Sequence, residues 1–157
     1  MKKNVMKAVP EELEKTLIEH GAQIIDGKLP GLEAVFYAEK GLFPGDWKKL
    51  LAEQAKKDKL AKEKYHVIKY LREKGYITRL SLDDSDFFRL YRKGFRPGMD
   101  KTAYLLKVAG KNWKTNISGL LDDLDSAGKL RKELVYAIAG DLEKKPIFVK
   151  VGRSSFE

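Results

Sequence analysis

The sequence predicts a mixed α/β protein of the α+β type, made of two domains packed on one another. Up to about residue 75, apolar residues recur at helical spacing between glycine and proline breaks. Beyond that point, short aromatic and β-branched runs are typical of strands. The run at residues 134–139 is apolar at odd and even positions alike, as in a strand covered on both faces. We expect a helical domain with a small sheet at residues 1–75, and a domain with a mixed central sheet at residues 76–157.

The first helix is expected to begin at Pro10 and to end at Gly21. Proline suits the first turn of a helix, and the glutamates that follow it favour the positive end of the helix dipole. Residues 22–25 are expected to form a short strand, which the Asp26-Gly27 pair then turns. His20, beside Gly21, is expected to complement the C-terminus of this helix.

Three more helices are expected before residue 75. Pro30-Gly31 opens the second, which ends at Gly41. Asp46 can cap the third, through about residue 55, and Asp58 can cap the fourth, which ends at Gly75. The last two helices are rich in lysine, which indicates either a solvated helical face or a surface for RNA.

The C-terminal half is expected to consist of five strands and one helix. The helix, at residues 115–129, carries four apolar residues on one side. The strands are expected at residues 76–80, 87–91, 102–108, 134–139 and 147–151.

Composition limits the chemistry that this chain can perform. Among its 157 residues there is no cysteine and there are only two histidines, which excludes disulfides and thiolate metal sites and argues against a histidine-rich metal site. We therefore expect no cofactor and no metal. The sequence has no apolar run of the roughly 18 residues that a transmembrane helix requires, and its first residues lack the features of a signal peptide, so we expect a cytoplasmic protein with no membrane partner.

The charge balance favours a polyanionic partner. The chain carries 32 basic and 23 acidic residues, a formal net charge of +9. Such an excess attracts nucleic acid, because each neutralised phosphate releases condensed counterions. A lysine-rich chain without cysteine also occurs among thermophile proteins for reasons of stability.

Four short motifs occur in an order that resembles the archaeal tRNA-splicing endonucleases. The first is a Glu-Ala pair followed by apolar and aromatic residues, the second a Leu-Arg pair before Gly-Tyr, the third an Asp-Phe strand that ends on tyrosine, and the fourth a Leu-Arg-Lys element before an apolar run. They lie at residues 32–41, 70–76, 86–91 and 130–135.

The resemblance implies a C-terminal domain of the restriction-endonuclease-like kind and a family activity. Members of the family cut precursor tRNA at bulge-helix-bulge junctions without metal, leaving a 2′,3′-cyclic phosphate and a 5′-hydroxyl. A tyrosine helps to deprotonate the attacking 2′-hydroxyl, a histidine protonates the leaving 5′-oxygen, and a lysine stabilises the phosphorane. Tyr91 and Lys132 hold the tyrosine and lysine positions, whereas Lys101 stands where the family has histidine.

Two departures from the family pattern point to a structural subunit of a heterotetrameric enzyme, which assembles with a histidine-bearing catalytic chain on precursor tRNA. The ordinary pKa of histidine, about 6.5, suits a general acid at neutral pH, whereas that of lysine, about 10.4, does not. Asp125 occupies the place of an RNA-gripping arginine, and a carboxylate repels phosphate. Tyr91 and Lys132 are then vestigial; outside the family pattern, they would be a packing residue and a residue at the solvent boundary.

Further residues are implicated in partner binding. In the resembled enzymes, an acidic loop of the structural subunit enters a basic pocket of the catalytic subunit, and Asp141 and Glu143 lie where that loop would be. The same segment also fits an ordinary hairpin turn. Lys129 and Arg153 are expected to contact RNA.

Three other hypotheses remain open. The first is an active splicing subunit in which Lys101, or a residue of a partner, replaces the histidine. The second is a basic RNA-binding adaptor unrelated to splicing. The third is a magnesium-dependent nuclease that uses Asp84 or Asp86 with the Glu143-Lys144-Lys145 run. His66, which lies among lysines, is expected to have no chemical role.

Overall fold

The chain is a mixed α/β protein, as the sequence predicted, and it divides into two compact units. A computed structural model describes residues 5–80, 86–94 and 103–156, and within these ranges it contains five helices and seven strands. The first unit comprises the described residues up to Tyr65, and the second comprises those from His66 onward. The predicted assignment of domains to residues 1–75 and 76–157 stays a prediction.

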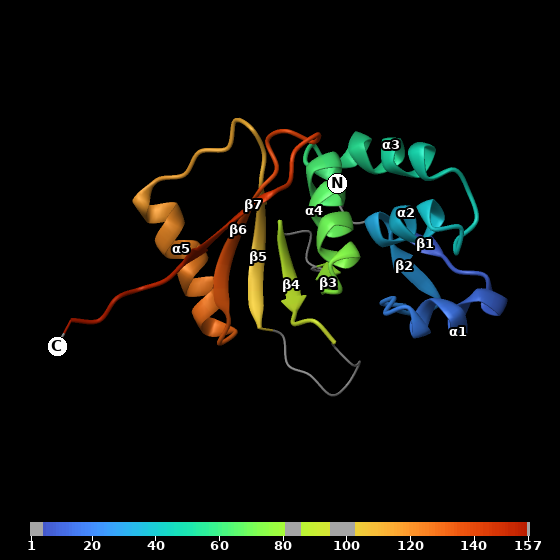
Figure 1. Cartoon of the computed structure of the whole chain (residues 1–157), viewed down its shortest axis with the longest axis horizontal. Helices are drawn as coiled ribbons and strands as arrows, with labels where there is room; N and C mark the ends of the chain where they lie inside the picture. Colours follow the sequence, from blue (N-terminus) through green and yellow to red (C-terminus); the bar gives the residue numbers. More distant parts are fainter. Residues whose placement is uncertain (1–4, 81–85, 95–102, 157) are drawn as a thin grey trace. The chain divides into compact units, whose positions relative to one another are not determined.

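The first unit combines a two-stranded antiparallel sheet with helices (Figure 1). Lys7 of the first strand pairs with Leu29 of the second. The elements are β1 (Met6–Ala8), α1 (Glu11–Glu19), β2 (Lys28–Pro30), α2 (Gly31–Glu39), α3 (Trp47–Lys57) and the beginning of α4 (Ala61–Glu73).

The prediction of a strand at residues 22–25 is wrong. Asp26 and Gly27 both have positive φ angles, of 51° and 73°, and this tight turn folds Ile25 back onto Lys28 in a single bridge. The strand forms after this turn instead, as β2. His20 lies where it was expected, with its ring Nδ1 2.8 Å from the carbonyl oxygen of Thr16 at the end of α1.

The core of the first unit is built around α2, which is buried along residues 31–37. Gly31 permits this burial, because a Cβ atom there would lie 2.1 Å from the side-chain nitrogen of Gln54 on α3. The Asp46 side chain caps α3 through the backbone N–H of Lys48, as predicted. Asp58, at the end of α3, accepts from the N–H of Leu60 and also receives the buried ammonium of Lys64 at 2.5 Å.

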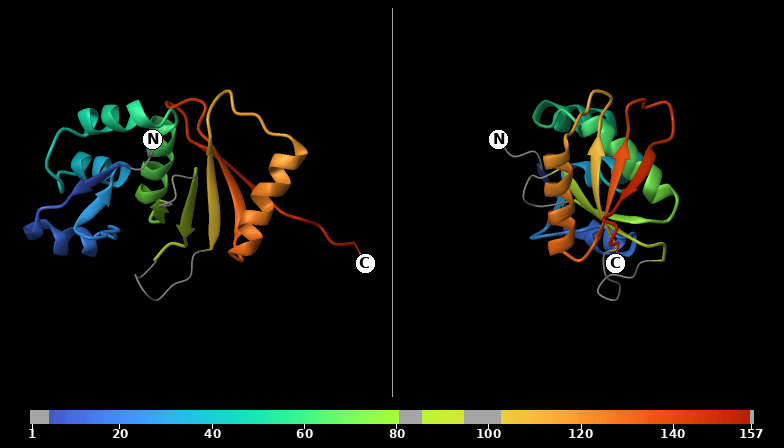
Figure 2. Two further views of the ribbon diagram at one scale, coloured as in Figure 1. Left: turned by 180° about the vertical axis from the view of Figure 1, so that it is seen from behind. Right: turned by 90° about the vertical axis from the view of Figure 1, so that its left-hand side faces the viewer.

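The second unit is built on a five-stranded mixed sheet with the order β3-β4-β5-β6-β7. Neighbouring strands are antiparallel except β5 and β6, which run the same way in the right-hand view of Figure 2. Helix α5 (Ile117–Lys129) connects these two strands. The strands are β3 (Ile77–Leu80), β4 (Phe87–Tyr91), β5 (Tyr104–Ala109), β6 (Glu133–Ile138) and β7 (Ile147–Val151).

Helices cover both faces of this sheet (Figure 1). On one face, α5 packs through Ala127 against Leu105, Leu134 and Tyr136. On the other face, the part of α4 within this unit contacts the sheet, and the rings of Tyr70 and Phe148 stack with their centroids 5.9 Å apart.

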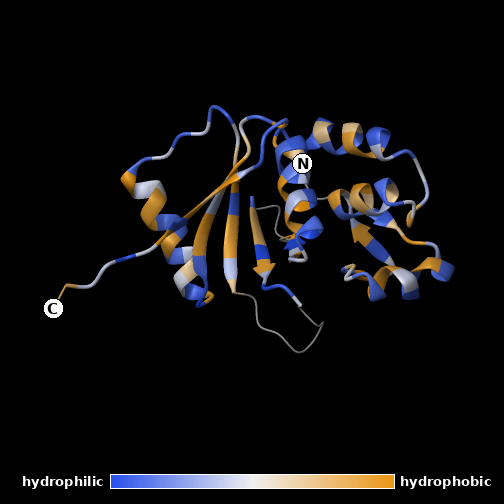
Figure 3. Cartoon of the chain, viewed as in Figure 1, coloured by the Kyte–Doolittle hydropathy of each residue, from blue (hydrophilic) through white to orange (hydrophobic). Residues whose placement is uncertain are grey.

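The apolar strand β6 is buried along residues 134–137, as predicted, and its hydrophobic character is evident in Figure 3. It lies inside the sheet between β5 and β7, with β5 as the middle strand. Within the described residues, β7 is an edge strand, and its Ile147 and Val149 side chains are 62% and 41% exposed.

Candidate functional site

The strand register brings the tyrosine and lysine positions to one end of the sheet. Leu90, next to Tyr91, pairs with Tyr104 at the start of β5, and Tyr104 pairs with Glu133, next to Lys132. The ladder continues beyond Tyr104, since Ala103 donates its N–H to the Leu90 carbonyl and accepts from the N–H of Glu133. Tyr91 and Lys132 therefore flank the beginning of β5.

Tyr91 and Lys132 also belong to the same face of the sheet. Side chains alternate along a strand, and Phe87 of β4 packs into the cluster beneath α5. Tyr91, four residues further, points to that same face. Lys132 lines a hollow together with Leu134, a member of the same cluster. Both side chains are half-buried.

The end of α5 fixes the backbone at Lys132. The N–H of Lys132 donates to the carbonyl of Ala127, and the N–H of Arg131 donates to that of Gly128. These two bonds form a Schellman motif, which ends a helix with one residue in the left-handed conformation. Arg131 takes that conformation with a φ of 56°. Glycine is the usual residue there, because a Cβ atom makes left-handed backbone unfavourable by about 1–2 kcal/mol.

The hollow beside Lys132 also contains the two residues that were expected to contact RNA. It has a volume of about 570 Å³ and contains Lys129, Lys132 and Arg153, but also Asp125 and Glu133. Arg153 donates to the carboxylate of Asp125 at 2.6 Å. Two carboxylates thus offset much of the positive charge in this hollow. Tyr91 is not among the residues that line it.

Two of the sequence-predicted positions fall outside the described residues. They are Lys101, at the family's histidine position, and Asp84, a ligand of the hypothetical magnesium site. Within residues 5–80, 86–94 and 103–156, no three histidine, cysteine, aspartate or glutamate side chains are grouped so that they could hold a metal ion.

Asp141 and Glu143 lie in an exposed turn between β6 and β7. One carboxylate oxygen of Asp141 accepts from the N–H of Glu143 at 3.0 Å, and the Asp141 carbonyl accepts from the N–H of Lys144. Leu142, between the two acids, is 43% exposed. His66 of α4 supports this turn, with its Nε2 2.7 Å from the Lys144 carbonyl oxygen. The segment is thus a formed turn that presents two carboxylates and an apolar side chain to solvent.

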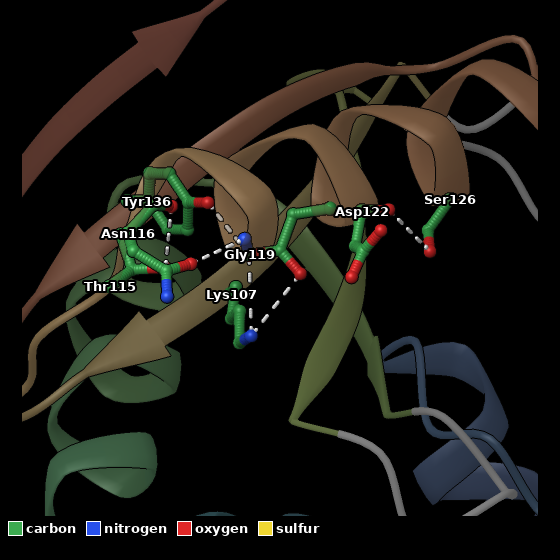
Figure 4. A network of polar contacts seen from close by, with 8 residues as sticks. Lys107, Thr115, Asn116, Gly119, Asp122, Ser126 and Tyr136 are labelled. Carbon is green, nitrogen blue, oxygen red and sulfur yellow. Dashed lines mark hydrogen bonds and ion pairs between the residues drawn. The ribbon is translucent and has the colours of Figure 1, made fainter.

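A polar network beneath α5 was missed by the sequence reasoning. Lys107 of β5 donates to both carboxylate oxygens of Asp123 at 3.2 and 3.3 Å, and the hydroxyl of Tyr136 on β6 donates to Asp123 at 2.7 Å (Figure 4). Burial, together with the hydrogen bond to Asp123, raises the pKa of Tyr136. One signal was available: Asp123 lies three residues after Leu120 and four before Ala127, on the apolar side of α5.

This network holds the beginning of α5 against the sheet. Asn116 caps the helix by accepting from the N–H of Gly119 at 2.8 Å, which Figure 4 shows beside Tyr136. The ring of Trp113 packs against that of Tyr136, with centroids 5.0 Å apart. Since α5 ends three residues before Lys132, these contacts help to position Lys132 at the end of the sheet.

None of the helices in the described part of the chain combines the length and apolar character that crossing a bilayer requires.

Known proteins resemble this chain over most of its length. Residues 61–147 match the family model described as tRNA intron endonuclease, catalytic C-terminal domain. A tRNA-splicing endonuclease from Methanothermobacter thermautotrophicus is 28% identical over 137 residues, covering 87% of this chain and 75% of the relative. A tRNA-splicing endonuclease from Thermococcus onnurineus is 28% identical over 139 residues, covering 82% and 78%, and one from Thermococcus gammatolerans is 29% identical over 132 residues, covering 78% and 76%.

Proposed function

The chain belongs to the tRNA intron endonuclease family, and on that premise we propose that it is a structural subunit of a tRNA-splicing endonuclease. In this role it supports assembly and substrate positioning for a histidine-bearing catalytic chain within a heterotetramer. The substrate is precursor tRNA, cut at bulge-helix-bulge motifs. The proposed location is the cytoplasm, where precursor tRNA is made in cells without a nucleus. We likewise propose residues 1–75 as the family's N-terminal domain and residues 76–157 as its nuclease-like domain.

The observation that carries this proposal is the lysine at position 101. Cleavage expels a 5′-alkoxide, which leaves slowly unless an acid with a pKa near the working pH protonates it. Histidine meets that need and an ordinary lysine does not. Neither histidine of the chain lies on a strand of this sheet. His20 follows α1 in the first unit, and His66 contacts the β6–β7 turn, at the end of the sheet opposite Tyr91 and Lys132.

The charges beside Lys132 support the same proposal. A phosphate that enters this hollow meets Asp125 and Glu133 as well as the cations. It would also compete with Asp125 for Arg153. Both partners of that ion pair are well exposed, so the pair itself adds little stability. Its effect on RNA is to lower the positive potential that a phosphate would meet.

The test compares the isolated chain with the assembled enzyme on a bulge-helix-bulge RNA in EDTA. The isolated chain should not cut, and a mixture with the histidine-bearing partner should cut without metal. Cleavage by the isolated chain would instead support an active subunit with a substituted acid. RNA binding without any effect of a nuclease partner would support a basic adaptor.

Matched variants in the two chains then separate structural from catalytic subunits. Tyr91→Phe or Lys132→Ala in this chain should change the rate of the complex little, because neither belongs to a complete catalytic set. The corresponding substitutions in the partner should lower the rate by roughly 100-fold or more, the scale of a true acid–base or electrostatic contribution. A loss of that size from the variants of this chain would contradict the structural role.

A further inference from the structure

A second hollow lies on the face of the sheet away from α5. It has a volume of about 730 Å³, and all of its lining residues belong to the second unit. Leu71 of α4 lines it together with Leu90 of β4 and Val135 of β6, all three of them buried. The hollow therefore has an apolar base between the sheet and the last turns of α4.

Aromatic rings surround this base. Tyr70, Tyr76, Tyr104 and Phe148 line the hollow, and each of them is only partly buried. Tyr70 and Phe148 stack on one another with an angle of 30° between their planes. Partly exposed rings beside an apolar base offer flat surfaces on which another ring can stack.

The rim of the hollow is cationic. Lys74, Arg92 and Lys93 line it and are exposed. The ammonium of Lys74 lies 5.6 Å from the ring centroid of Tyr70, and that of Lys93 lies 5.3 Å from the ring centroid of Tyr76. No aspartate or glutamate is among the described residues that line the hollow. It thus differs from the hollow beside Lys132, where carboxylates offset the cations.

We propose that this second hollow binds an unpaired nucleotide of the RNA substrate. A nucleotide joins a flat base to a phosphate, and proteins that hold single strands combine aromatic stacking with cations that follow the backbone. The base stacks against Tyr76, with Tyr104 beside it in the lining, and Arg92 and Lys93 hold the adjoining phosphates. This proposal rests on the proposed RNA substrate, whether or not the chain is catalytic.

The place of the hollow in the sheet suits substrate positioning. Leu90 and Tyr104, which line it, are register partners at the sheet end that also carries Tyr91 and Lys132. The hollow opens on the face of Leu90, whereas Tyr91 points to the other face. A strand of RNA at this sheet end can therefore place one unpaired base in the hollow without entering the hollow beside Lys132.

An acidic peptide with aromatic side chains has similar chemistry and is the competing occupant. The formal net charge of +9 and the family's RNA substrate favour the nucleotide. The test must therefore measure RNA binding and partner assembly separately.

The experiment measures binding of a fluorescein-labelled single-stranded RNA of about ten nucleotides to the full chain in EDTA, by fluorescence anisotropy at several salt concentrations. Tyr76→Leu should weaken binding by about five- to 150-fold, the range for losing one base stack. Tyr76→Phe retains the ring and should bind as the wild type does.

Lys93→Gln should lower the slope of log affinity against log salt by about 0.7, the value for one phosphate contact on a single strand. Lys111→Gln removes an exposed lysine outside the hollow and should change neither quantity.

Cross-linking tests the site if a variant folds poorly. The wild-type chain, irradiated with RNA that carries 4-thiouridine, should yield adducts on the peptides that contain Tyr76 or Tyr104. Adducts confined to other peptides would overturn the proposal. Equal RNA binding by wild type and a folded Tyr76→Leu variant would overturn it as well.

Assembly with the catalytic chain separates this proposal from the proposed function. If the hollow variants lose the partner chain but keep RNA affinity, the hollow is a protein-docking surface and the nucleotide site is rejected. If the complex cuts normally while Tyr76→Leu binds RNA as the wild type does, the nucleotide site alone fails. If the isolated chain cuts RNA, the structural role fails, and the binding results still decide the nucleotide site.

Discussion

At the scale of single residues, the protonation of Tyr136 is tied to folding. Its hydroxyl donates to Asp123, and burial and this bond together raise its pKa above the ordinary value. A raised pKa in the folded state means that folding favours the protonated phenol. The stabilisation is fully present below the pKa of the unfolded phenol, about 10, and it is lost as the pH rises through the folded-state value.

We therefore predict that the free energy of unfolding falls steadily above about pH 10. Chemical denaturation at a series of alkaline pH values measures this loss, and Tyr136→Phe should make it shallower. At neutral pH the same substitution should cost about 1–2 kcal/mol, because Asp123 loses one of its donors. An equal alkaline loss in the variant would show that Tyr136 is not the responsible group.

The site could be predicted at this scale only in part. Tyr91 and Lys132 were placed at the family's tyrosine and lysine positions because each ends or precedes a strand at a spacing that the family shares. The register brings them to one sheet end, and their roles stay predictions. The contact between Lys107 and Asp123 depends on how α5 lies across β5, which local periodicity does not specify. The Arg153–Asp125 pair joins residues 28 positions apart and was equally out of reach.

At the scale of elements, a buried ion pair joins the connection between α3 and α4 to the first turn of α4. Lys64 and Asp58 are 2% and 5% exposed, and their charged atoms lie 2.5 Å apart. Removal of one member of such a pair leaves the other charge buried without its partner, which typically costs about 3–5 kcal/mol. The pair therefore makes the start of α4 sensitive to substitution.

We predict that Lys64→Met destabilises the chain on that scale, as measured by urea denaturation at neutral pH. Lys62→Met is the matched control, since Lys62 is an exposed lysine of the same helix. It should change the free energy of unfolding by no more than about 0.5 kcal/mol. Combining Lys64→Met with Asp58→Asn should recover part of the loss, because asparagine can still accept from the N–H of Leu60 and carries no charge. A loss no larger than that of Lys62→Met would contradict this prediction.

Elements with strong local signals were predicted well, and elements that depend on distant partners were not. The cap at Asp46 and the alternating residues of β4 identified α3 and β4 with few errors. The three-residue strand β1 has no alternation long enough to detect and exists because it pairs with β2. The same dependence on pairing explains why the strand expected at residues 22–25 formed instead at Lys28–Pro30.

At the scale of the whole molecule, the proposed heterotetramer requires a surface that recognises the catalytic chain. The acidic turn is the proposed surface, since Asp141 and Glu143 are exposed on a turn held by its own hydrogen bonds. Asparagine at position 141 preserves the acceptor of the turn and removes only the charge. This substitution therefore tests electrostatic docking without disturbing the fold.

Asp141→Asn combined with Glu143→Gln should release the catalytic partner at high dilution and abolish cleavage by the diluted mixture. The loss of a desolvated charge pair typically costs about 2–5 kcal/mol, which weakens a complex by one or more orders of magnitude. Mass photometry measures assembly, and circular dichroism should show an unchanged fold. Glu12→Gln, an exposed acid on α1, is the control and should leave assembly intact. Complementary charge reversal in the partner's pocket should restore the complex, whereas normal assembly of the double variant would reduce the segment to an ordinary turn.

The edge strand β7 limits the concentration of unassembled protein that a cell can keep free of aggregation. Its outer backbone groups have no strand partner among the described residues, and the exposed Ile147 and Val149 lie along it. Such an edge can pair with the edge of another copy, which is how surplus protein begins to aggregate. Charged residues on an edge strand oppose such pairing, and Lys150 is the one charged residue of β7. If the chain assembles with the proposed catalytic partner, it is best made in step with that partner, so that few copies remain in excess.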